Sequence, residues 1–349
     1  MKDITLSRIT GSLLGQAIGD ALGSQTEFRS HVTATDLMPT WGYPYPAFSD
    51  DTQMALAIAE AFLIQKPIDG DEKSIDRFMS EVSINFRHWL IGRWGKNDRS
   101  PGGTCMSGAG RLNREGTNWR DTGTTHSGKG NGGPMRSSPV GMALYTAPEF
   151  AFKIGALTSV PTHNNIEAQI ASASVAFLVA TSISGYGFSS AVGSLFELLG
   201  SWDKIIHPYT RSSEKTDWAI ARFASAFAYG KAQLDSKIFH KINTNTSPNG
   251  IKGSDFKSIE AVASAIFHNA KYSNYEDIVF STANTTGDSD TTSAIAGAII
   301  GARVGDSKIK KDWRDRVETS DYLHDLAYSL YMLNEVPVTE SEKELEISQ

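Results

Sequence analysis

The sequence predicts an all-α fold, in the form of a compact bundle of many helices. Two observations carry this prediction. Most segments with a regular apolar pattern repeat at helical spacing, and no long stretch rich in Val, Ile and Thr alternates as a strand would. The length of 349 residues would allow about two domains. No sharp change of composition marks a linker, however, so we expect a single domain over residues 1–338.

The expected helices follow one another along the whole chain. Apolar residues fall on one helical face between Arg8 and Leu22, between Met54 and Phe62, and between Ile166 and Val179. Further helices are expected at 74–91, 189–200, 216–230, 258–269, 292–304 and 321–334, with a short one at 105–114.

Two polar, glycine-rich stretches interrupt these helices, at about 93–139 and 237–257. A loop of that length inside a compact domain is usually functional or mobile. We interpret the first stretch as a lid over a binding cleft, with a disordered loop as the alternative. Residues 339–349 read as a polar tail.

Charge and cysteine content exclude several classes of protein. The chain has 33 Lys and Arg residues against 39 Asp and Glu residues, a formal net charge of -6, which argues against a nucleic-acid binder. A single cysteine rules out an internal disulfide framework and a multi-cysteine zinc site. We see no signal peptide and no apolar run long enough to span a membrane, and we therefore expect a cytoplasmic protein.

Glycines form a stripe in two segments at opposite ends of the chain. Each glycine inside a helix costs about 0.5–1 kcal/mol relative to alanine, so a compensating reason is expected. A stripe without side chains allows a second helix to approach closely. We expect the two helices to pack in the centre of the protein, on each other. The stripe residues are Gly11, Gly15, Gly19 and Gly23, then Gly297, Gly301 and Gly305.

Two acidic motifs dominate the chemistry. Ser49-Asp50-Asp51-Thr52 and Gly287-Asp288-Ser289-Asp290-Thr291 each stand just before an apolar helical segment. Helix capping is the simplest explanation of either motif. Capping needs one side-chain oxygen, however, whereas each motif gathers two carboxylates and flanking hydroxyls. Hard oxygen ligands without His or Cys suit Mg²⁺ or Mn²⁺, and two facing motifs could hold two such ions.

The glycine-rich stretch contains weaker signals. Residues 123–130 are one residue short of a phosphate-binding P-loop, and no apolar strand precedes them, which excludes that motif. Backbone N–H groups near Gly130, Gly132 and Gly133 could still approach a phosphate oxygen. His163 is either structural or functional, and Cys105 reads as a small buried side chain rather than a nucleophile.

Five segments in sequence order resemble the ADP-ribosylglycohydrolases, and together they span residues 11–305. They are GQAIGDALG with the following Glu27-Phe28, SDDTQM, NGGPMRSSPVG, PTH and GDSDTTSAIAGAIIGA. The resemblance implies an all-α orthogonal bundle with two divalent cations, Mg²⁺ or Mn²⁺. By motif, it implies the metal ligands Ser49, Asp50, Asp51, Asp288, Asp290 and Thr291.

The resemblance also implies catalytic and substrate-binding residues. Glu27 matches the acidic residue that handles protons beside the metals, so that Glu27, Asp51 and Asp288 would be catalytic. The segment Asn131, Gly132, Gly133 and Met135 matches the loop along the ADP-ribose diphosphate, and His163 matches a residue lining that cleft. The family often has Thr where Ser49 stands, and the stretch 93–130 is hard to match, which leaves substrate specificity open.

The function that follows is metal-dependent removal of ADP-ribose from modified protein side chains, with arginine as the favoured linkage. A small ADP-ribose ester is an alternative substrate. A different class is an immunity protein that binds and blocks an ADP-ribosyltransferase toxin. The expected partners are an ADP-ribosylated protein and a cognate ADP-ribosyltransferase, with neither nucleic acid nor membrane.

Overall fold

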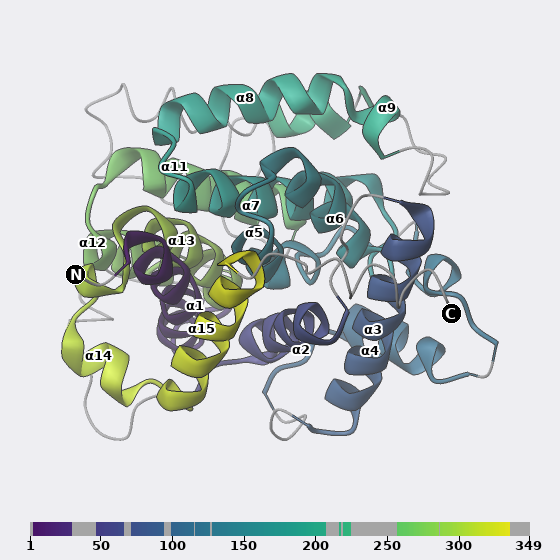
Figure 1. Cartoon of the computed structure of the whole chain (residues 1–349), viewed down its shortest axis with the longest axis horizontal. Coiled ribbons are helices and arrows are strands. Elements are labelled where there is room, and N and C mark those ends of the chain that lie inside the picture. Colours follow the sequence, from purple (N-terminus) through teal and green to yellow (C-terminus); the bar gives the residue numbers. More distant parts are fainter. Residues whose placement is uncertain are drawn as a thin grey trace.

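The computed structural model describes residues 3–29, 47–65, 71–93, 99–114, 116–125, 128–206, 216–217, 219–224, 257–285 and 287–335. Over these residues the chain is helical, and a lone antiparallel bridge between Gly130 and Lys257 takes the place of a sheet. The all-α prediction is therefore confirmed. The helices, shown in Figure 1, are α1 (Ile4–Gly23), α2 (Asp50–Ile64), α3 (Glu72–Leu90), α4 (Gly103–Leu112), α5 (Ser138–Ala143), α6 (Pro148–Ser159), α7 (Ile166–Ile183), α8 (Phe188–Gly200), α9 (Trp202–Ile205), α11 (Ser258–Lys271), α12 (Tyr275–Ala283), α13 (Ser289–Val304), α14 (Lys311–Arg316) and α15 (Ser320–Glu335), with short 3-10 turns η1 (Trp119–Asp121), η2 (Pro134–Arg136) and η5 (Asp306–Lys308).

Every helix expected from the apolar pattern is present where the structure describes it. For the segment 216–230, residues 216–217 and 219–224 are helical, and the remainder lies outside the described residues. The polar stretch 237–256 and the tail 339–349 also lie outside them. The stretch 93–139 contains α4, η1, η2 and the start of α5, so it holds more helical structure than the single short helix expected there.

A large part of the core is the pair α1 and α13, which lie side by side (Figure 1), run antiparallel and share the most extensive contact between any two described helices. The glycine stripe explains how closely they approach. A Cβ atom added to Gly15 would lie 2.4 Å from the carbonyl oxygen of Gly297, and one added to Gly297 would lie 2.2 Å from that of Gly15. The backbones are therefore in direct contact, and the prediction that these two helices pack on each other is confirmed.

Helix α7 forms the other part of the core, between α6 and α13. All of its residues are buried. By length and composition it is the one helix among the described residues that could cross a membrane. Complete burial inside the protein accounts for that composition, because a helix enclosed on all sides needs apolar residues all round.

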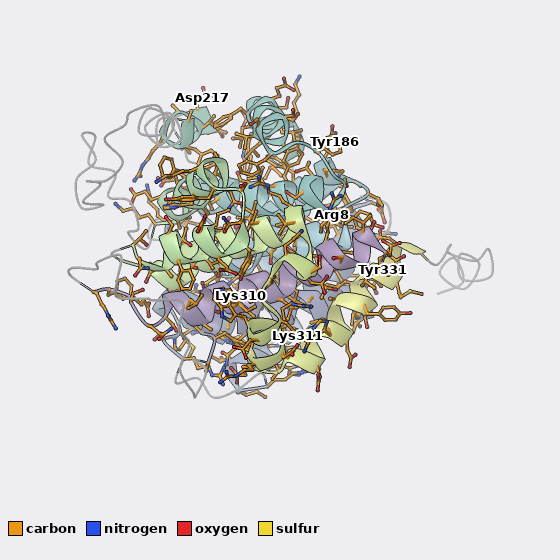
Figure 2. The ribbon with its side chains drawn as sticks, turned by 90° about the vertical axis from the view of Figure 1, so that its left-hand side faces the viewer. Arg8, Tyr186, Asp217, Lys310, Lys311 and Tyr331 are labelled. Carbon is orange, nitrogen blue, oxygen red and sulfur yellow. The ribbon has the colours of Figure 1, made fainter. Side chains whose placement is uncertain are left out.

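Side chains at the periphery hold the outer helices to this core. Figure 2 shows the face formed by α1, α13, α14 and α15. There Arg8 donates to the carbonyl oxygen of Ile183 at 3.0 Å, and Lys310 pairs with Glu276 at 2.8 Å, which ties α14 to α12. The end of the pair at which α1 finishes and α13 begins carries the second acidic motif.

Candidate active site

The antiparallel packing of α1 and α13 brings the end of one helix to the start of the other. A Cβ atom on Gly23, at the end of α1, would lie 2.4 Å from the carbonyl oxygen of Ser289, in the first turn of α13. The start of α2 joins them, because the carboxylate of Asp20 on α1 accepts the N–H of Ser49 at 2.8 Å. Three helix termini that are far apart in sequence therefore meet at one place.

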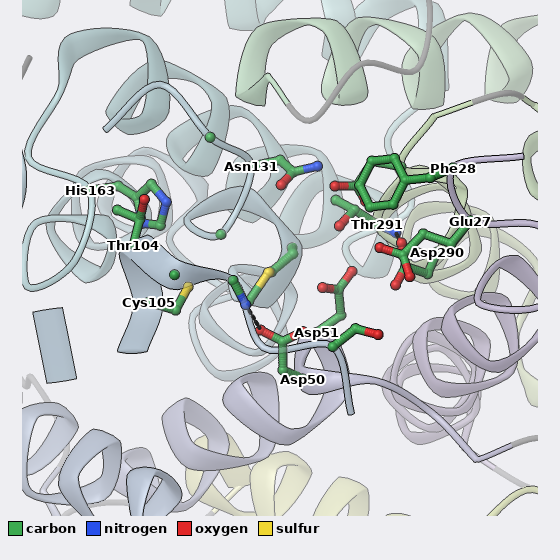
Figure 3. A pocket seen from close by; sticks show the side chains of 17 residues that line it. Glu27, Phe28, Asp50, Asp51, Thr104, Cys105, Asn131, His163, Asp290 and Thr291 are labelled. Atoms are coloured by element: carbon green, nitrogen blue, oxygen red, sulfur yellow. Dashed lines mark hydrogen bonds between the residues drawn. The ribbon is translucent and has the colours of Figure 1, made fainter. Parts of the chain in front are cut away.

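A pocket of about 250 Å³ opens at this meeting point (Figure 3). Its walls come from the loop after α1, the starts of α2, α4 and α13, the segment before η2, and the turn before α7. The lining residues are Glu27, Phe28, Asp50, Asp51, Ser100, Gly102, Gly103, Thr104, Cys105, Gly130, Asn131, Gly132, Met135, His163, Asp288, Asp290 and Thr291.

Ten of the twelve residues singled out from the sequence line this pocket, all except Ser49 and Gly133. Ser49 lies at the adjacent helix start, where its hydroxyl accepts the N–H of Asp51 at 3.2 Å and caps α2. Gly133 faces the protein interior, since a Cβ atom there would lie 2.6 Å from the hydroxyl oxygen of Ser172. The structure thus brings the two acidic motifs, Glu27 and the Asn131–Met135 segment together, while their chemical roles stay predictions.

The acidic side chains lie close enough to share a cation. Carboxylate oxygens of Glu27, Asp288 and Asp290 lie within 4.8 Å of one another. Asp50 and Asp51 lie in the same pocket, and both are buried. Like charges at such distances repel strongly in a poorly solvated site.

Burial and mutual repulsion raise the pKa values of Glu27, Asp50, Asp51 and Asp290, which together with Asp288 make up the acidic cluster. Burial, followed by repulsion from Asp288 and Asp20, raises the pKa of Glu27 to about 7. Burial likewise raises the pKa of Asp50 and of Asp51 well above the usual range, and neighbouring carboxylates add to both effects. The pKa of Asp290 is also raised, by burial first and then by Asp288 and Asp51. Positive charge placed in the pocket would reverse these shifts.

The donor set fits a hard divalent cation. One carboxylate oxygen of Asp51, Oδ2, is buried and has no hydrogen-bond partner within the described part of the chain. Neither Lys nor Arg occurs among the described residues that line the pocket. An orphaned, buried carboxylate oxygen surrounded by further carboxylates is costly unless a cation pairs with it. Oxygen ligands of this kind suit Mg²⁺ and Mn²⁺.

Sequence reasoning missed Asp20, which lies inside α1 and holds the start of α2 in place. Its fully buried carboxylate accepts hydrogen bonds from Ser49 N at 2.8 Å, Thr52 N at 3.0 Å and the Thr52 hydroxyl at 2.6 Å. Asp20 therefore caps a helix other than its own. A signal for it existed, since it is the one ionisable residue in the apolar, glycine-striped segment from Ile9 to Gly23.

Sequence reasoning also missed the start of α4 as a wall of the pocket. No side chain caps this helix, and Gly102 N instead donates to Asp50 Oδ2 at 3.4 Å. A Cβ atom added at Gly102 or Gly103 would meet nothing within 4 Å, so this backbone is open to the cavity. Free N–H groups at a helix start favour anions. The dipeptide of glycines before an expected helix was the available signal.

Cys105, in the first turn of α4, has the character expected from the sequence. It is buried, and burial raises the pKa of its thiol to about 12. A thiol with so high a pKa is a poor nucleophile at neutral pH. The interpretation of Cys105 as a small buried side chain therefore agrees with the structure.

The loop from Lys129 to Met135 forms the wall opposite the acidic cluster. Its start is held by the bridge to Lys257 and by Ser258 N, which donates to Lys129 O at 2.9 Å. Its end is held by the side chain of Gln16, which donates to Met135 O at 3.0 Å. Asn131 lies between these anchors, facing the side of the pocket that carries Phe28 (Figure 3). Its amide nitrogen is buried and has no partner within the described residues, so a donor is available to a ligand.

Comparison with known proteins gives a consistent result. A family model described as ADP-ribosylglycohydrolase matches residues 1–339. The chain is 25% identical to ADP-ribosylarginine hydrolase Tri1 of Pseudomonas putida, over 93% of this chain and 78% of that protein. It is 24% identical to the ADP-ribosyl-dinitrogen reductase glycohydrolase of Rhodospirillum rubrum, over 89% of this chain and 90% of that protein.

One solved structure shows that the fold is shared. A chain described as an ADP-ribosylglycohydrolase-related protein complex superposes with a TM-score of 0.67 at 21% identity, covering 94% of this chain and 98% of that chain. The likeness therefore extends over nearly the whole of both chains.

Proposed function

The chain belongs to the ADP-ribosylglycohydrolase family, hydrolases that remove ADP-ribose, and from this premise we propose that it cleaves the N-glycosidic bond between ADP-ribose and an arginine side chain of a modified protein. The reaction we propose depends on two divalent cations, Mg²⁺ or Mn²⁺. The observation that carries the proposal is the convergence of carboxylates from the loop after α1 and from the starts of α2 and α13 in one pocket.

In this proposal the metals are held by the two acidic motifs, with Asp50 and Asp51 on one side and Asp288, Asp290 and Thr291 on the other. Ser49 is adjacent and completes the first motif. Bound cations would supply the positive charge that the cluster lacks, orient the ribose hydroxyls and lower the pKa of water. The orphaned Oδ2 atom of Asp51 supports this assignment.

The carboxylates also suit the transition state of the reaction. Glycoside cleavage develops positive charge on the anomeric carbon, which negative groups nearby stabilise. Glu27 lines the pocket beside the proposed metal ligands, where its carboxyl can give or take a proton. We propose that Glu27 exchanges this proton with the leaving nitrogen or with the attacking water.

The opposite half of the pocket suits the diphosphate. The backbone of Gly103 at the start of α4 is open to the cavity, and Asn131, in the loop opposite the acidic cluster, has a free amide donor. Donors of this type bind phosphate oxygens without adding positive charge to the acidic cluster. The substrate would thus lie across the pocket, with its distal ribose at the carboxylates.

Two observations favour arginine as the modified side chain. The relative from Pseudomonas putida is named an ADP-ribosylarginine hydrolase. In addition, Phe28 lines the pocket beside Glu27 (Figure 3), and this residue is 59% exposed. An exposed aromatic face next to a carboxylate suits a planar guanidinium, which stacks on rings and pairs with carboxylates.

A release assay tests this function directly. Protein substrates carrying ADP-ribose on arginine, on serine or on cysteine are incubated with the chain, with and without a chelator, and free ADP-ribose is measured by mass spectrometry. We expect release from arginine in the presence of Mg²⁺ or Mn²⁺ and none with the chelator. Release from serine alone would move the specificity to another linkage. No release from any substrate would reject hydrolysis in favour of a protein that only blocks an ADP-ribosyltransferase.

A further inference from the structure

A buried arginine lies directly behind the pocket wall. The guanidinium of Arg136 is fully buried, stacked at 4.4 Å on the ring of Phe86. It donates to Thr158 O at 3.1 Å and to the hydroxyl oxygen of Thr162 at 2.7 Å. Within the described residues no carboxylate bonds to it. The shortest of these hydrogen bonds runs from the charged guanidinium to the threonine hydroxyl oxygen, and it fixes the orientation of that hydroxyl.

The direction of the next hydrogen bond follows from the groups around Thr162. Its oxygen accepts from Arg136, so its hydrogen is left for another acceptor. The candidates are Ser159 O at 3.5 Å and the Nδ1 atom of His163 at 2.8 Å. Ser159 O already accepts the backbone N–H groups of His163 at 2.8 Å and of Thr162 at 3.1 Å, which occupy both of its lone pairs. The hydroxyl hydrogen therefore goes to Nδ1.

We infer that Arg136 and Thr162 act as positioning residues, holding His163 as the tautomer that carries its proton on Nε2. With Nδ1 occupied as an acceptor, a neutral imidazole has its N–H on the other nitrogen. The relay runs from the guanidinium of Arg136 through the hydroxyl of Thr162 to the ring of His163. All three side chains are buried, so water does not compete for these bonds.

The ring remains neutral at physiological pH. Burial first, and then the positive charge of Arg136, lowers the pKa of His163 to about 3. A neutral ring with Nδ1 engaged can only donate from Nε2. It cannot accept a hydrogen bond there, and it adds no positive charge to the pocket.

The free edge of the ring borders the pocket. His163 lines the cavity, and its Cε1 and Nε2 atoms would lie 2.5 Å and 3.1 Å from a Cβ atom added at Gly132. Gly132 belongs to the same segment as Arg136, so the loop carries both the cation that orients the ring and the backbone against which the ring lies. In Figure 3 His163 lies at the end of the pocket away from Glu27 and Asp290.

This placement suggests what the relay does, and this part of the inference rests on the proposed function. The end of the pocket away from the carboxylates is where we place the diphosphate. An Nε2–H donor there would bind an oxygen of ADP-ribose, whereas the other tautomer would present a lone pair to that oxygen and repel it. The relay would thus contribute to ADP-ribose binding without taking part in bond cleavage.

The tautomer is measured on the protein without any ligand. Protein labelled with ¹⁵N in histidine gives imidazole nitrogen signals that identify the protonated ring nitrogen, and His163→Gln assigns the relevant pair. We expect an Nε2–H ring in the unaltered protein and in Thr162→Ser, which keeps the hydroxyl. We expect loss of that signature in Thr162→Val. An Nδ1–H ring in the unaltered protein would overturn the inference, whether or not the chain is an ADP-ribose hydrolase.

ADP-ribose affinity, measured by calorimetry, provides the second readout. Thr162→Val should weaken binding about tenfold, the effect of losing one hydrogen bond, with little change in kcat for bound substrate. Thr162→Ser should restore the affinity. Thr158→Val is the matched control, because it removes another buried hydroxyl, one that bonds only within α6. Equal weakening in Thr158→Val would reduce the effect to general packing and contradict the relay. Absence of ADP-ribose binding in the unaltered protein, with the Nε2–H signature present, would reject the proposed function and leave the tautomer assignment standing.

Discussion

At the scale of single residues, Asp51 and Asp288 show why we propose a cation in the pocket. Both carboxylates are buried, they come from different helices, and Asp51 Oδ2 has no partner within the described residues. Substituting either residue by Asn keeps its shape and removes one negative charge.

We expect Asp51→Asn and Asp288→Asn to lower hydrolysis about a hundredfold or more, because each removes a ligand of the proposed metal pair. Circular dichroism should remain unchanged in both. Asp325→Asn, at an exposed carboxylate on α15, is the control and should retain full activity. Normal release of ADP-ribose by either pocket variant would remove these residues from the proposed metal site.

Residue patterns predicted the acidic cluster but not its supports. Asp50, Asp51, Asp288 and Asp290 stand in pairs at helix starts, which is visible in the sequence. Asp20 stands alone within an apolar helix, which marks it as unusual, but its role depends on the backbone of another helix, and no local pattern could indicate that contact. The open backbone at the start of α4 was not recognised as a pocket wall either, because pairs of glycines occur in many loops that bind no ligand.

At the scale of elements, Asp20 acts as a helix cap supplied from outside the helix. Its carboxylate accepts from Ser49 N, Thr52 N and the Thr52 hydroxyl. In Asp20→Asn a side-chain NH₂ group replaces one carboxylate oxygen, and it cannot accept a hydrogen bond from the donor that it faces. The start of α2 would therefore shift, and Asp50 and Asp51 would move with it.

We therefore expect Asp20→Asn to weaken Mn²⁺ binding, measured by calorimetry, about tenfold or more, as for groups that orient metal ligands. Asp71→Asn is the control. Asp71 is the N-cap residue of α3 itself, and Asn also serves as an N-cap. A variant that keeps its Mn²⁺ affinity would show that Asp20 stabilises the fold without positioning the ligands.

The glycine stripe makes a second prediction at this scale. In Gly297→Ala the new Cβ atom would lie 2.2 Å from Gly15 O, so α1 and α13 would have to separate. We expect a loss of at least about 2–3 kcal/mol in the free energy of unfolding, measured with urea. Gly193→Ala in α8 is the control, since its Cβ atom meets nothing within 4 Å. It should be neutral or stabilising by up to about 1 kcal/mol. Similar losses in both variants would mean that helix approach is not what the stripe provides.

Helices with a clear apolar pattern were predictable, and the others were not. Segments such as Ile166 to Ile183 are long and strongly apolar, so the helical spacing of their apolar residues can be recognised in the sequence. Four of the missed helices are short: α9 has four residues, α5 and α14 have six each, and α12 has nine. The fifth, α6, begins at Pro148 and contains Gly155. These helices are stabilised by packing against their neighbours, and the sequence of a short segment alone does not reveal those contacts.

At the scale of the whole molecule, the site depends on which helix ends the fold brings together. The sequence predicted that α1 and α13 pack together, and the metal hypothesis required the start of α2 to lie near them. The sequence did not show that Asp20 and Gln16 on α1 hold the start of α2 there. The result is an acidic cluster inside a chain whose formal net charge is only -6. Local concentration of charge therefore matters more here than the total.

The acidic cluster should make the stability of the metal-free protein depend on pH in a specific direction. The folded-state pKa values of Asp50, Asp51, Asp290 and Glu27 are raised, that of Glu27 to about 7. Above the unfolded pKa of about 4, the folded state therefore binds more protons than the unfolded state, and the free energy of unfolding falls as pH rises. Buried His163 acts in the opposite direction, because its lowered pKa favours the folded state increasingly as pH rises, but only up to the unfolded histidine pKa of about 6.5.

Between about pH 6.5 and pH 8 the histidine contribution is constant, so the carboxyl groups determine the slope. We expect the Tm of the chelator-treated protein to fall over this range. Saturating Mg²⁺ should raise the Tm, and should raise it more at the upper end, because the cation binds the deprotonated carboxylates and competes with their protons. Asp51→Asn should flatten the slope of the metal-free protein, since one of the raised carboxyl groups is gone. A Tm that is constant or increases with pH in the metal-free protein would show that these carboxylates are already neutralised by other means, and the requirement for a cation would lose its electrostatic basis.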